Sequence, residues 1–210
     1  MNRKEYFDSV AHLWDEWNRE EEMVGRIREG LVSFGIRPDE HVVDLGCGTG
    51  VLFGPLLELL SPRGHVECVD FSERMIEIAR CRSSDPTLTF HVSAATSLPV
   101  DDCSVDRVIC FSTWPHFPKP RAVLREVWRA LRSGGRLHVW HLSGRETINS
   151  IHREAGGSIG EDLLCPAKEL ALTATRCGFE VEVVADESTT YLVTVFKQQP
   201  NSGEREHARS

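Results

Sequence analysis

The spacing of apolar residues predicts two helices at the start of the chain and a strand–helix alternation after them. Apolar side chains recur every three or four residues through 3–34, in two pieces, as on one face of a helix. From 41 onward, short β-branched runs alternate with stretches of helical spacing. Continuous apolar strands that alternate with helices indicate a parallel sheet covered on both faces. The predicted strands cover 41–45, 65–69, 88–92, 105–111 and 136–142, and the predicted helices cover 51–60, 72–81 and 119–132.

The last part of the chain departs from this alternation. Pro166 and Gly178 are typical of the start and the end of a helix, and the spacing between them is helical. Two β-rich runs follow, and only the polar residues 186–189 connect them. Since so short a connection can only form a hairpin, one strand must run antiparallel to the rest. The predicted elements are a helix over 167–177 and strands over 179–185 and 190–197.

The composition is that of one ordinary globular domain. With 210 residues, of which 40% are hydrophobic and 27% charged, the chain is long enough for one full-sized core and too short for two. Its formal net charge is −8, and the arginines between 121 and 132 follow helical spacing, as on a solvated face. Proteins that wrap nucleic acid need a basic stripe. We therefore expect no extended nucleic acid as a partner.

Neither the apolar runs nor the cysteines indicate export or membrane insertion. No apolar run approaches the ~20 residues that span a bilayer, and residues 1–5 lead into a mixed polar stretch. The seven cysteines form no C-x-x-C pair, and several lie in apolar runs, where a free thiol packs as a small hydrophobe. We expect a cytoplasmic protein without a membrane span, whose cysteines are reduced and form neither disulfides nor a zinc site.

The most informative segment is a glycine-rich turn after the first predicted strand. It reads Val42-Val43-Asp44-Leu45-Gly46-Cys47-Gly48-Thr49-Gly50, so a buried strand ends in a carboxylate and glycine then takes every second position. Glycine permits a sharp turn and close approach of a ligand, and the next helix offers unpaired N–H groups to an anion. A dinucleotide fingerprint, G-x-G-x-x-G, would need glycine where the chain has Val51. The spacing D-x-G-x-G-x-G therefore points away from a dinucleotide.

A second acidic residue, Asp70, follows the next predicted strand, 20 residues after Gly50. A carboxylate at this place can accept hydrogen bonds from both hydroxyls of a ribose. The other interpretation is that Asp70 caps the helix that begins near Ser72. Because Asp70 occurs together with the glycine-rich turn, ribose binding is the favoured interpretation.

These segments resemble the class I S-adenosylmethionine-dependent methyltransferases, and within them the small-molecule branch typified by the ubiquinone and menaquinone biosynthesis methyltransferases. The resemblance runs from about 40 to 137. It also rests on Leu98-Pro99, Asp106, Leu124, Glu126, Arg129, Leu131, Gly134 and Gly135. It implies S-adenosylmethionine as the cofactor and a doubly wound, Rossmann-like α/β fold. The seven strands would have the order 3-2-1-4-5-7-6, with the last strand pair antiparallel.

The resemblance also implies which residues bind the cofactor. Asp44 and the glycine-rich turn would line its methionine and ribose portion, Asp70 would hold the ribose, and Phe71 and Met75 would flank the adenine. The chain departs from the family at Ala94, where relatives often have a carboxylate that meets the adenine amino group. The backbone N–H of Ala95 and the side chain of Thr96 or Ser97 are the candidate replacements. The expected cofactor residues are Asp44, Gly46, Cys47, Gly48, Gly50, Asp70, Phe71, Ser72, Met75, Ala94, Ala95, Thr96, Phe111, Tyr6 and Trp14.

The expected domain division is a helical lid over 1–35, an S-adenosylmethionine-binding methyltransferase domain over 36–197 and a flexible polar tail over 198–210. Relatives often close an N-terminal helix over the cofactor, which excludes water from the transfer site. Tyr6 and Trp14 are the aromatic residues that we expect on the inner side of such a lid.

Candidate groups for the acceptor follow from the position of the strand ends. Methyl transfer is an in-line displacement that needs an aligned nucleophile and sometimes a base, and in a doubly wound sheet such groups lie beyond the carboxyl ends of the strands. His116 follows the fourth predicted strand, where a packing role is the alternative, and His141 ends the fifth. Arg145, Asn149 and His152 share one face of a predicted helix, and we expect that face to be solvent-exposed. The catalytic candidates are His116, His141 and His152.

The predicted function is methyl transfer from S-adenosylmethionine to a small molecule, with a histidine that orients or deprotonates the acceptor. One alternative is an acceptor that is metal-bound or a metalloid and is held by His116, His141 and His152, the candidate metal ligands. Another is a non-catalytic module that senses S-adenosylmethionine, which Ala94 favours. A small-molecule substrate is the expected partner, and the sequence gives no indication of the oligomeric state.

Overall fold

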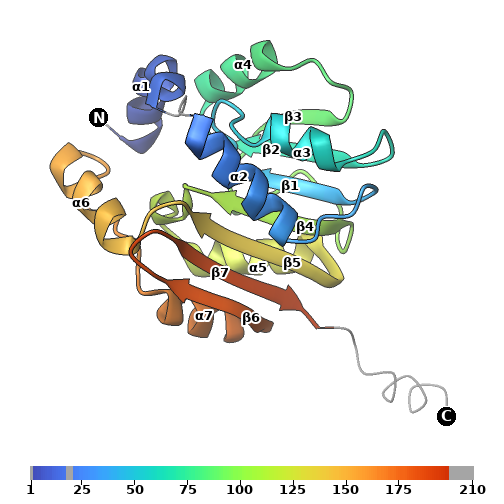
Figure 1. The fold of residues 1–210 in the computed structure, drawn as a ribbon. Coiled ribbons are helices and arrows are strands. Elements are labelled where there is room, and N and C mark those ends of the chain that lie inside the picture. Colours follow the sequence, from blue (N-terminus) through green and yellow to red (C-terminus); the bar gives the residue numbers. More distant parts are fainter. Residues whose placement is uncertain (1, 18–20, 199–210) are drawn as a thin grey trace.

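A computed structural model of the chain describes residues 2–17 and 21–198, and for 13–17 and 21 it describes the backbone alone (Figure 1). Its strands are β1 (His41–Leu45), β2 (His65–Asp70), β3 (Leu88–Val92), β4 (Val105–Phe111), β5 (Leu131–His141), β6 (Phe179–Asp186) and β7 (Tyr191–Lys197). Its helices are α1 (Arg3–Trp17), α2 (Glu21–Ser33), α3 (Phe53–Leu59), α4 (Glu73–Arg82), the 3₁₀ turn η1 (Trp114–His116), α5 (Pro120–Ala130), α6 (Arg145–Ala155) and α7 (Ala167–Thr175).

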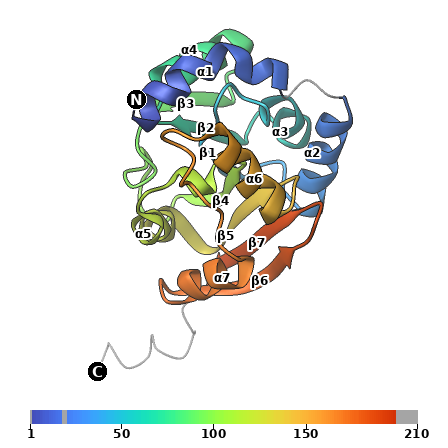
Figure 2. The same cartoon turned by 90° about the vertical axis from the view of Figure 1, so that its left-hand side faces the viewer.

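All seven strands join one sheet in the order β3-β2-β1-β4-β5-β7-β6, which confirms the predicted order. The first five strands pair in parallel, and β7 pairs antiparallel with both β5 and β6. The predicted hairpin is therefore present. Because β1, β2, β4 and β5 are parallel, their carboxyl ends lie at one edge of the sheet. The helices α1 and α6 also lie at this edge (Figures 1 and 2).

Helices cover both faces of the sheet, as the apolar strands require. On one face, Ile27 of α2, Phe53 of α3 and Ile76 of α4 pack with alternate strand residues such as Val42 and Val66. These five side chains are at most 2% exposed. The helices α2, α3 and α4 therefore belong to the core of the fold on this face.

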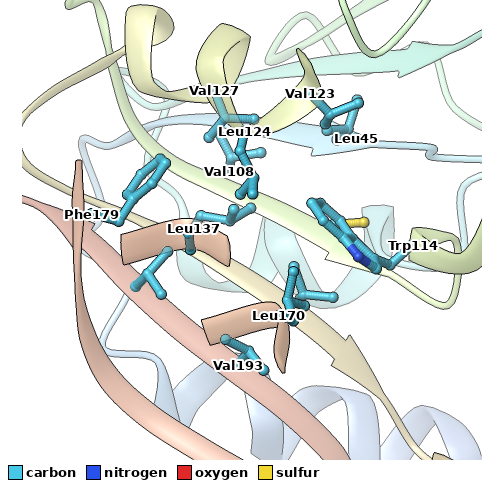
Figure 3. Packing of buried hydrophobic residues seen from close by; sticks show 14 of the residues in the cluster. Leu45, Val108, Trp114, Val123, Leu124, Val127, Leu137, Leu170, Phe179 and Val193 are labelled. Carbon is cyan, nitrogen blue, oxygen red and sulfur yellow. The ribbon is translucent and has the colours of Figure 1, made fainter. Parts of the chain in front are cut away.

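The opposite face packs against α5 and α7 (Figure 3). Val108 of β4 and Leu137 of β5 lie between Leu124 of α5 and Leu170 of α7, and Trp114 closes the cluster near the carboxyl edge. The strong one-sided pattern of α5 arises because Leu124 and its neighbours at helical spacing are buried, while Arg121 and Arg125 are exposed.

The structure moves one predicted boundary by several residues. The strand β5 begins at Leu131 rather than at 136, because Leu131 takes an extended conformation (φ −67°, ψ 135°) and pairs with Val105. This ends α5 at Ala130. Among the described residues, no helix combines the length and the apolar character that a membrane crossing needs. The polar tail expected over 198–210 lies outside the described residues from 199 onward.

A buried ion pair fixes the amino end of the sheet to the segment that follows α2. Arg107 of β4 donates to both oxygens of Glu40, at 2.7 and 2.9 Å, and also to His138 Nε2 at 2.8 Å. Both members of the pair are 3% exposed. Since Arg107 donates to His138 Nε2, the ring donates through Nδ1 to Thr194 (2.9 Å) and is neutral. Burial, and then the charge of Arg107, lowers the pKa of His138 well below its usual value.

Removing one partner of this pair is expected to leave an uncompensated buried charge. Glu40→Ala should lower the free energy of unfolding by about 3–5 kcal/mol. The matched control is Arg28→Ala, which breaks an exposed ion pair with Glu58 (2.6 Å) and should cost less than about 1 kcal/mol. Urea denaturation of the three proteins measures both values. Equal costs for the two variants would contradict this account of the amino end.

Candidate functional site

The glycine-rich turn between β1 and α3 brings the backbone close to neighbouring strands. Gly46 (φ +76°) and Cys47 donate their N–H groups to the carbonyl of Val69 at 2.7 and 3.1 Å. A Cβ at Gly46 would lie 2.5 Å from the side chain of Thr113, and φ is in the left-handed region that favours glycine. The turn therefore needs glycine at 46 for two independent reasons.

Asp70 connects the end of β2 to this turn. Its Oδ2 accepts from the N–H of Gly48 (3.0 Å), and its Oδ1 accepts from the N–H of Ser72 (2.9 Å). The cap of α4 is Ser72, whose hydroxyl accepts from the N–H of Met75. Asp70 is therefore not the cap residue of this helix, and each of its oxygens retains acceptor capacity toward the adjoining cavity. Burial raises the pKa of Asp70, although the backbone hydrogen bonds act in the opposite direction.

Asp44 lies beneath the turn and is 1% exposed. Among the described residues, its Oδ2 has no hydrogen-bond partner. Burial, followed by the charge of Asp70, raises the pKa of Asp44 to about 8. A buried carboxylate oxygen without a partner is costly in a folded protein, so it marks a place where a polar or cationic ligand group would fit.

A cavity of about 450 Å³ opens beside the ends of β1 and β2 and is bordered by Asp70, Phe71, Thr113 and the loop 93–96. A smaller cavity of about 50 Å³ continues from it. Gly46, Asp70, Phe71, Thr113 and His116 line both cavities. The two cavities are thus parts of one site at the carboxyl edge of the sheet.

The structure brings most of the expected cofactor residues to this site. The residues that line one or both cavities are Gly46, Cys47, Gly48, Asp70, Phe71, Met75, Ala94, Ala95, Thr96 and Phe111. Asp44 and Ser72 are buried behind the lining, and Gly50 lies against the ring of Phe53. Tyr6 lines neither cavity, and the side chain of Trp14 lies outside the described residues.

The helix α1 covers the smaller cavity with Phe7 rather than with Tyr6. The ring of Phe7 packs edge-on against Phe71 (5.8 Å between centroids) and against His116 (4.8 Å). Tyr6 instead packs edge-on against Phe7, with 5.4 Å between the ring centroids. The aromatic spacing of α1 indicated a covering helix, but its rotation, which selects Phe7, depends on packing against α4.

The three catalytic candidates come together next to the cavities. The rings of His116 and His152 lie 4.9 Å apart, and His141 is close enough for the charges of both to act on it. Burial, and then those two charges, lowers the pKa of His141 to about 3. Among the described residues, the Nε2 atom of His141 has no hydrogen-bond partner. These histidines do not form a metal-ligand cluster in the described part of the chain.

The prediction that Arg145, Asn149 and His152 are solvent-exposed is wrong for two of the three. Asn149 is 3% exposed and His152 is 9% exposed, whereas Arg145 pairs with Asp186 at the surface. Asn149 exchanges two hydrogen bonds with the backbone of Leu164, at 3.1 and 2.7 Å. The segment after α6 folds back over this face and buries it.

Asp162, in that segment, joins the histidines to the covering helix. Its Oδ2 lies 2.9 Å from His116 Nδ1, its backbone carbonyl bonds to His152 Nδ1, and its carboxylate forms an ion pair with Arg3 of α1. Burial alone would raise the pKa of Asp162, but the hydrogen bonds from His116 and Arg3 outweigh it and lower the pKa to about 2. No motif in the sequence distinguished Asp162, because its partners come from segments distant along the chain.

Comparison with known proteins identifies a related domain over this site. Residues 42–135 match the family described as "Methyltransferase domain". The chain is 31% identical over 149 residues to the demethylmenaquinone methyltransferase of Symbiobacterium thermophilum, which is 63% of this chain and 56% of that protein. It is 33% identical over 112 residues to the malonyl-[acyl-carrier protein] O-methyltransferase of Bacillus cereus, which is 53% of this chain and 40% of that protein.

The chain spans between about a third and about a half of the length of the curated relatives that it matches. Among solved structures, it is similar to a Haloferax volcanii methyltransferase in complex with the Trm112 methyltransferase activator. The TM-score is 0.73 at 21% identity, and the match covers 92% of this chain and 98% of that chain. At this identity, the similarity shows a common fold.

The raised pKa of Asp44 predicts a specific pH dependence of stability. Because the folded protein binds the Asp44 proton more tightly than the unfolded chain, stability falls as the pH rises from the unfolded pKa of about 3.9 toward the folded value of about 8. Asp44→Asn does not titrate. The unfolding free energy of the variant minus that of the wild type should therefore rise by more than about 1 kcal/mol from about pH 5 to about pH 8. One pKa unit corresponds to about 1.4 kcal/mol.

Urea denaturation of the ligand-free proteins at both pH values measures this difference. Asp39→Asn, an exposed carboxylate, is the matched control and should show no such change. A difference between Asp44→Asn and wild type that is independent of pH would contradict the environment described for Asp44.

Proposed function

We propose that this chain, a class I S-adenosylmethionine-dependent methyltransferase by its motifs, fold and family match, transfers the methyl group of that cofactor to a small-molecule acceptor. The observation that carries the proposal is a cavity lined by the glycine-rich turn and the buried carboxylate of Asp70, with a second buried carboxylate, Asp44, behind that lining. When bound, S-adenosylmethionine supplies a methyl group that its sulfonium already activates.

The residues of the site fit this cofactor. Asp44 Oδ2, which lacks a hydrogen-bond partner within the described part of the chain, suits a cationic amino group, whose charge would lower the pKa of this carboxyl. Asp70 retains acceptor capacity for ribose hydroxyls, and Phe71 offers an aromatic surface beside Ala94. Since Ala94 has no polar side chain, the N–H of Ala95 and the side chain of Thr96 are the groups that would recognise the adenine ring.

His116 is the residue best placed to act as a general base. It lines both cavities, and its Nδ1 lies 2.9 Å from the Asp162 carboxylate. Because a carboxylate only accepts, Nδ1 carries a proton, and Nε2 is the nitrogen that would act as the base. A carboxylate that holds a histidine in this tautomer is a recurring arrangement in general-base catalysis. His141, which its low pKa keeps neutral, would orient the acceptor, and His152 would help to hold Asp162 in place.

The covering element of the site is α1 rather than the whole segment 1–35. Phe7 of α1 lies against the site, and Arg3 pairs with Asp162. In contrast, Ile27 and Leu31 of α2 are fully buried in the core of the sheet. We therefore restrict the lid to α1 and assign α2 to the methyltransferase domain. Water exclusion by Phe7 would favour the transfer step.

A cofactor-sensing role without catalysis is the second candidate. Ala94, which removes one expected contact to the adenine, favours it. The grouping of His116 and His141 beside the cavity favours the enzyme, because a sensor needs no second set of polar groups. An acceptor that is a metal ion or metalloid held by His116, His141 and His152 has less support, since their ring nitrogens are not gathered as ligands.

Cofactor binding is tested by calorimetric titration with S-adenosylmethionine, its demethylated product and NAD. We expect the first two to bind and NAD not to bind. Asp70→Asn should weaken binding at least about tenfold, because a charge-assisted hydrogen bond is worth about 1.5–3 kcal/mol. Asp39→Asn, at an exposed site, should bind as the wild type does. Absence of binding by the wild type would refute the cofactor assignment.

Catalysis is tested by transfer of a labelled methyl group from S-adenosylmethionine into a protein-free extract of small molecules. His116→Gln should reduce transfer by about 10²–10⁴-fold, the typical contribution of a general base, and should leave cofactor affinity nearly unchanged. His12→Gln, an exposed histidine on α1, is the control. Binding without any transfer by the wild type would favour the sensor, and full activity of His116→Gln would exclude His116 as the base.

A further inference from the structure

A second polar cluster lies away from the cofactor site, on the first three strands of the chain. His41 begins β1, His65 begins β2, Glu67 follows in β2, and His91 lies in β3. His41 is the register partner of His65, and Val69 is the partner of His91. Since side chains alternate along a strand, all four groups project from the same face of the sheet. These three strands are neighbours (Figure 1).

The distances in this cluster are those of a metal-ligand set. His41 Nε2 and His65 Nε2 each lie 3.2 Å from Glu67 Oε1, and the three atoms lie within 4.8 Å of one another. Tetrahedral Zn²⁺ with bonds of about 2.0–2.1 Å places neighbouring ligand atoms about 3.3 Å apart. The nitrogen and oxygen atoms therefore need little movement to surround one ion.

The surroundings orient these ligands as in known metal sites. His41 Nδ1 lies 3.3 Å from the carbonyl oxygen of Ser104 and can donate its proton there. Nε2 bonds to Glu67 in the metal-free protein, and it would release its proton when a metal takes its place beside the carboxylate. His91 Nε2 bonds to the other carboxylate oxygen, Glu67 Oε2, at 2.6 Å. Second partners of this kind, a carbonyl for a histidine and a donor for a carboxylate, fix the orientation of metal ligands.

The cluster is held rigidly and is open to solution. The side chain of Glu67 is 13% exposed, whereas those of His41 and His65 are 27% and 36% exposed. The carboxylate is thus fixed within the sheet while the histidine side leads to solvent. Three imidazoles around one carboxylate suit Zn²⁺, Cu²⁺ and Ni²⁺, whereas Mg²⁺ and Ca²⁺ prefer all-oxygen sites.

We propose that His41, His65 and Glu67 bind one divalent transition-metal ion, with Zn²⁺ as the reference ion, through His41 Nε2, His65 Nε2 and Glu67 Oε1. His91 holds the second oxygen of Glu67, and the fourth coordination position faces solvent. The ion would join the amino ends of β1 and β2 by bonds between side chains. The site is independent of the methyltransferase assignment, because none of its four residues lines the cofactor cavities.

The test uses the untagged full-length chain, freed of metal by chelation and then titrated with Co²⁺ and Zn²⁺. We expect one equivalent of Co²⁺ to give saturable visible absorption, Zn²⁺ to displace it, and Zn²⁺ to raise the thermal unfolding temperature. His65→Ala and Glu67→Gln should each weaken Zn²⁺ binding at least about 100-fold, and His91→Ala about 10–100-fold, as for other second partners of metal ligands. Mg²⁺ should produce neither effect.

His12→Ala removes an exposed histidine elsewhere and should leave Zn²⁺ affinity unchanged. Circular dichroism of each metal-free variant shows whether it folds, and Glu67→Gln keeps the test valid if His65→Ala does not. The proposal is overturned if the wild type shows no saturable Co²⁺ absorption. It is also overturned if folded His65→Ala and Glu67→Gln retain wild-type affinity, or if His12→Ala weakens binding as much as they do.

Discussion

Two carboxylates near the ends of adjacent parallel strands, Asp44 and Asp70, are both buried, and the charge of Asp70 disfavours ionisation of Asp44. Such a pair is costly in a protein interior unless backbone N–H groups or a ligand compensate it. The chain compensates Asp70 by drawing the glycine-rich turn against β2, which is possible because Gly46 can adopt a positive φ. Asp44 is left with one oxygen that has no hydrogen-bond partner among the described residues. The shape of the turn, the position of the cavity and the place for a polar ligand all depend on this arrangement.

Much of the fold could be predicted because the pattern of apolar residues carries it. The buried strands β1 and β4 were found at their full lengths, since continuous apolar runs are required where helices cover both faces. The strand order came from the family resemblance, and the structure confirms it. The early start of β5 was not predictable in this way, because Leu131 satisfies a helical and an extended pattern equally well and its pairing with Val105 decides the outcome.

The residues of the candidate site also differ in whether the sequence could predict them. Residues within one short segment, such as Gly46 and Gly48, could be identified from spacing because their geometry is local. Asp162 and Phe7 could not, since their roles arise from contacts between segments far apart in the chain. The polar face of α6 was also mispredicted because a distant segment decides its environment. A stripe of polar residues usually faces solvent, but here the backbone of Leu164 supplies partners that allow Asn149 to be buried.

The position of β7 in the sheet determines when the sheet can finish assembling during synthesis. β7 is the last of the described strands along the chain, yet it lies between β5 and β6. As the chain emerges from the ribosome, β5 therefore has an unpaired edge until 191–197 have been synthesised. An exposed edge of this kind can pair with other chains. A chain truncated before 191 would therefore expose the β5 edge to pairing with other chains.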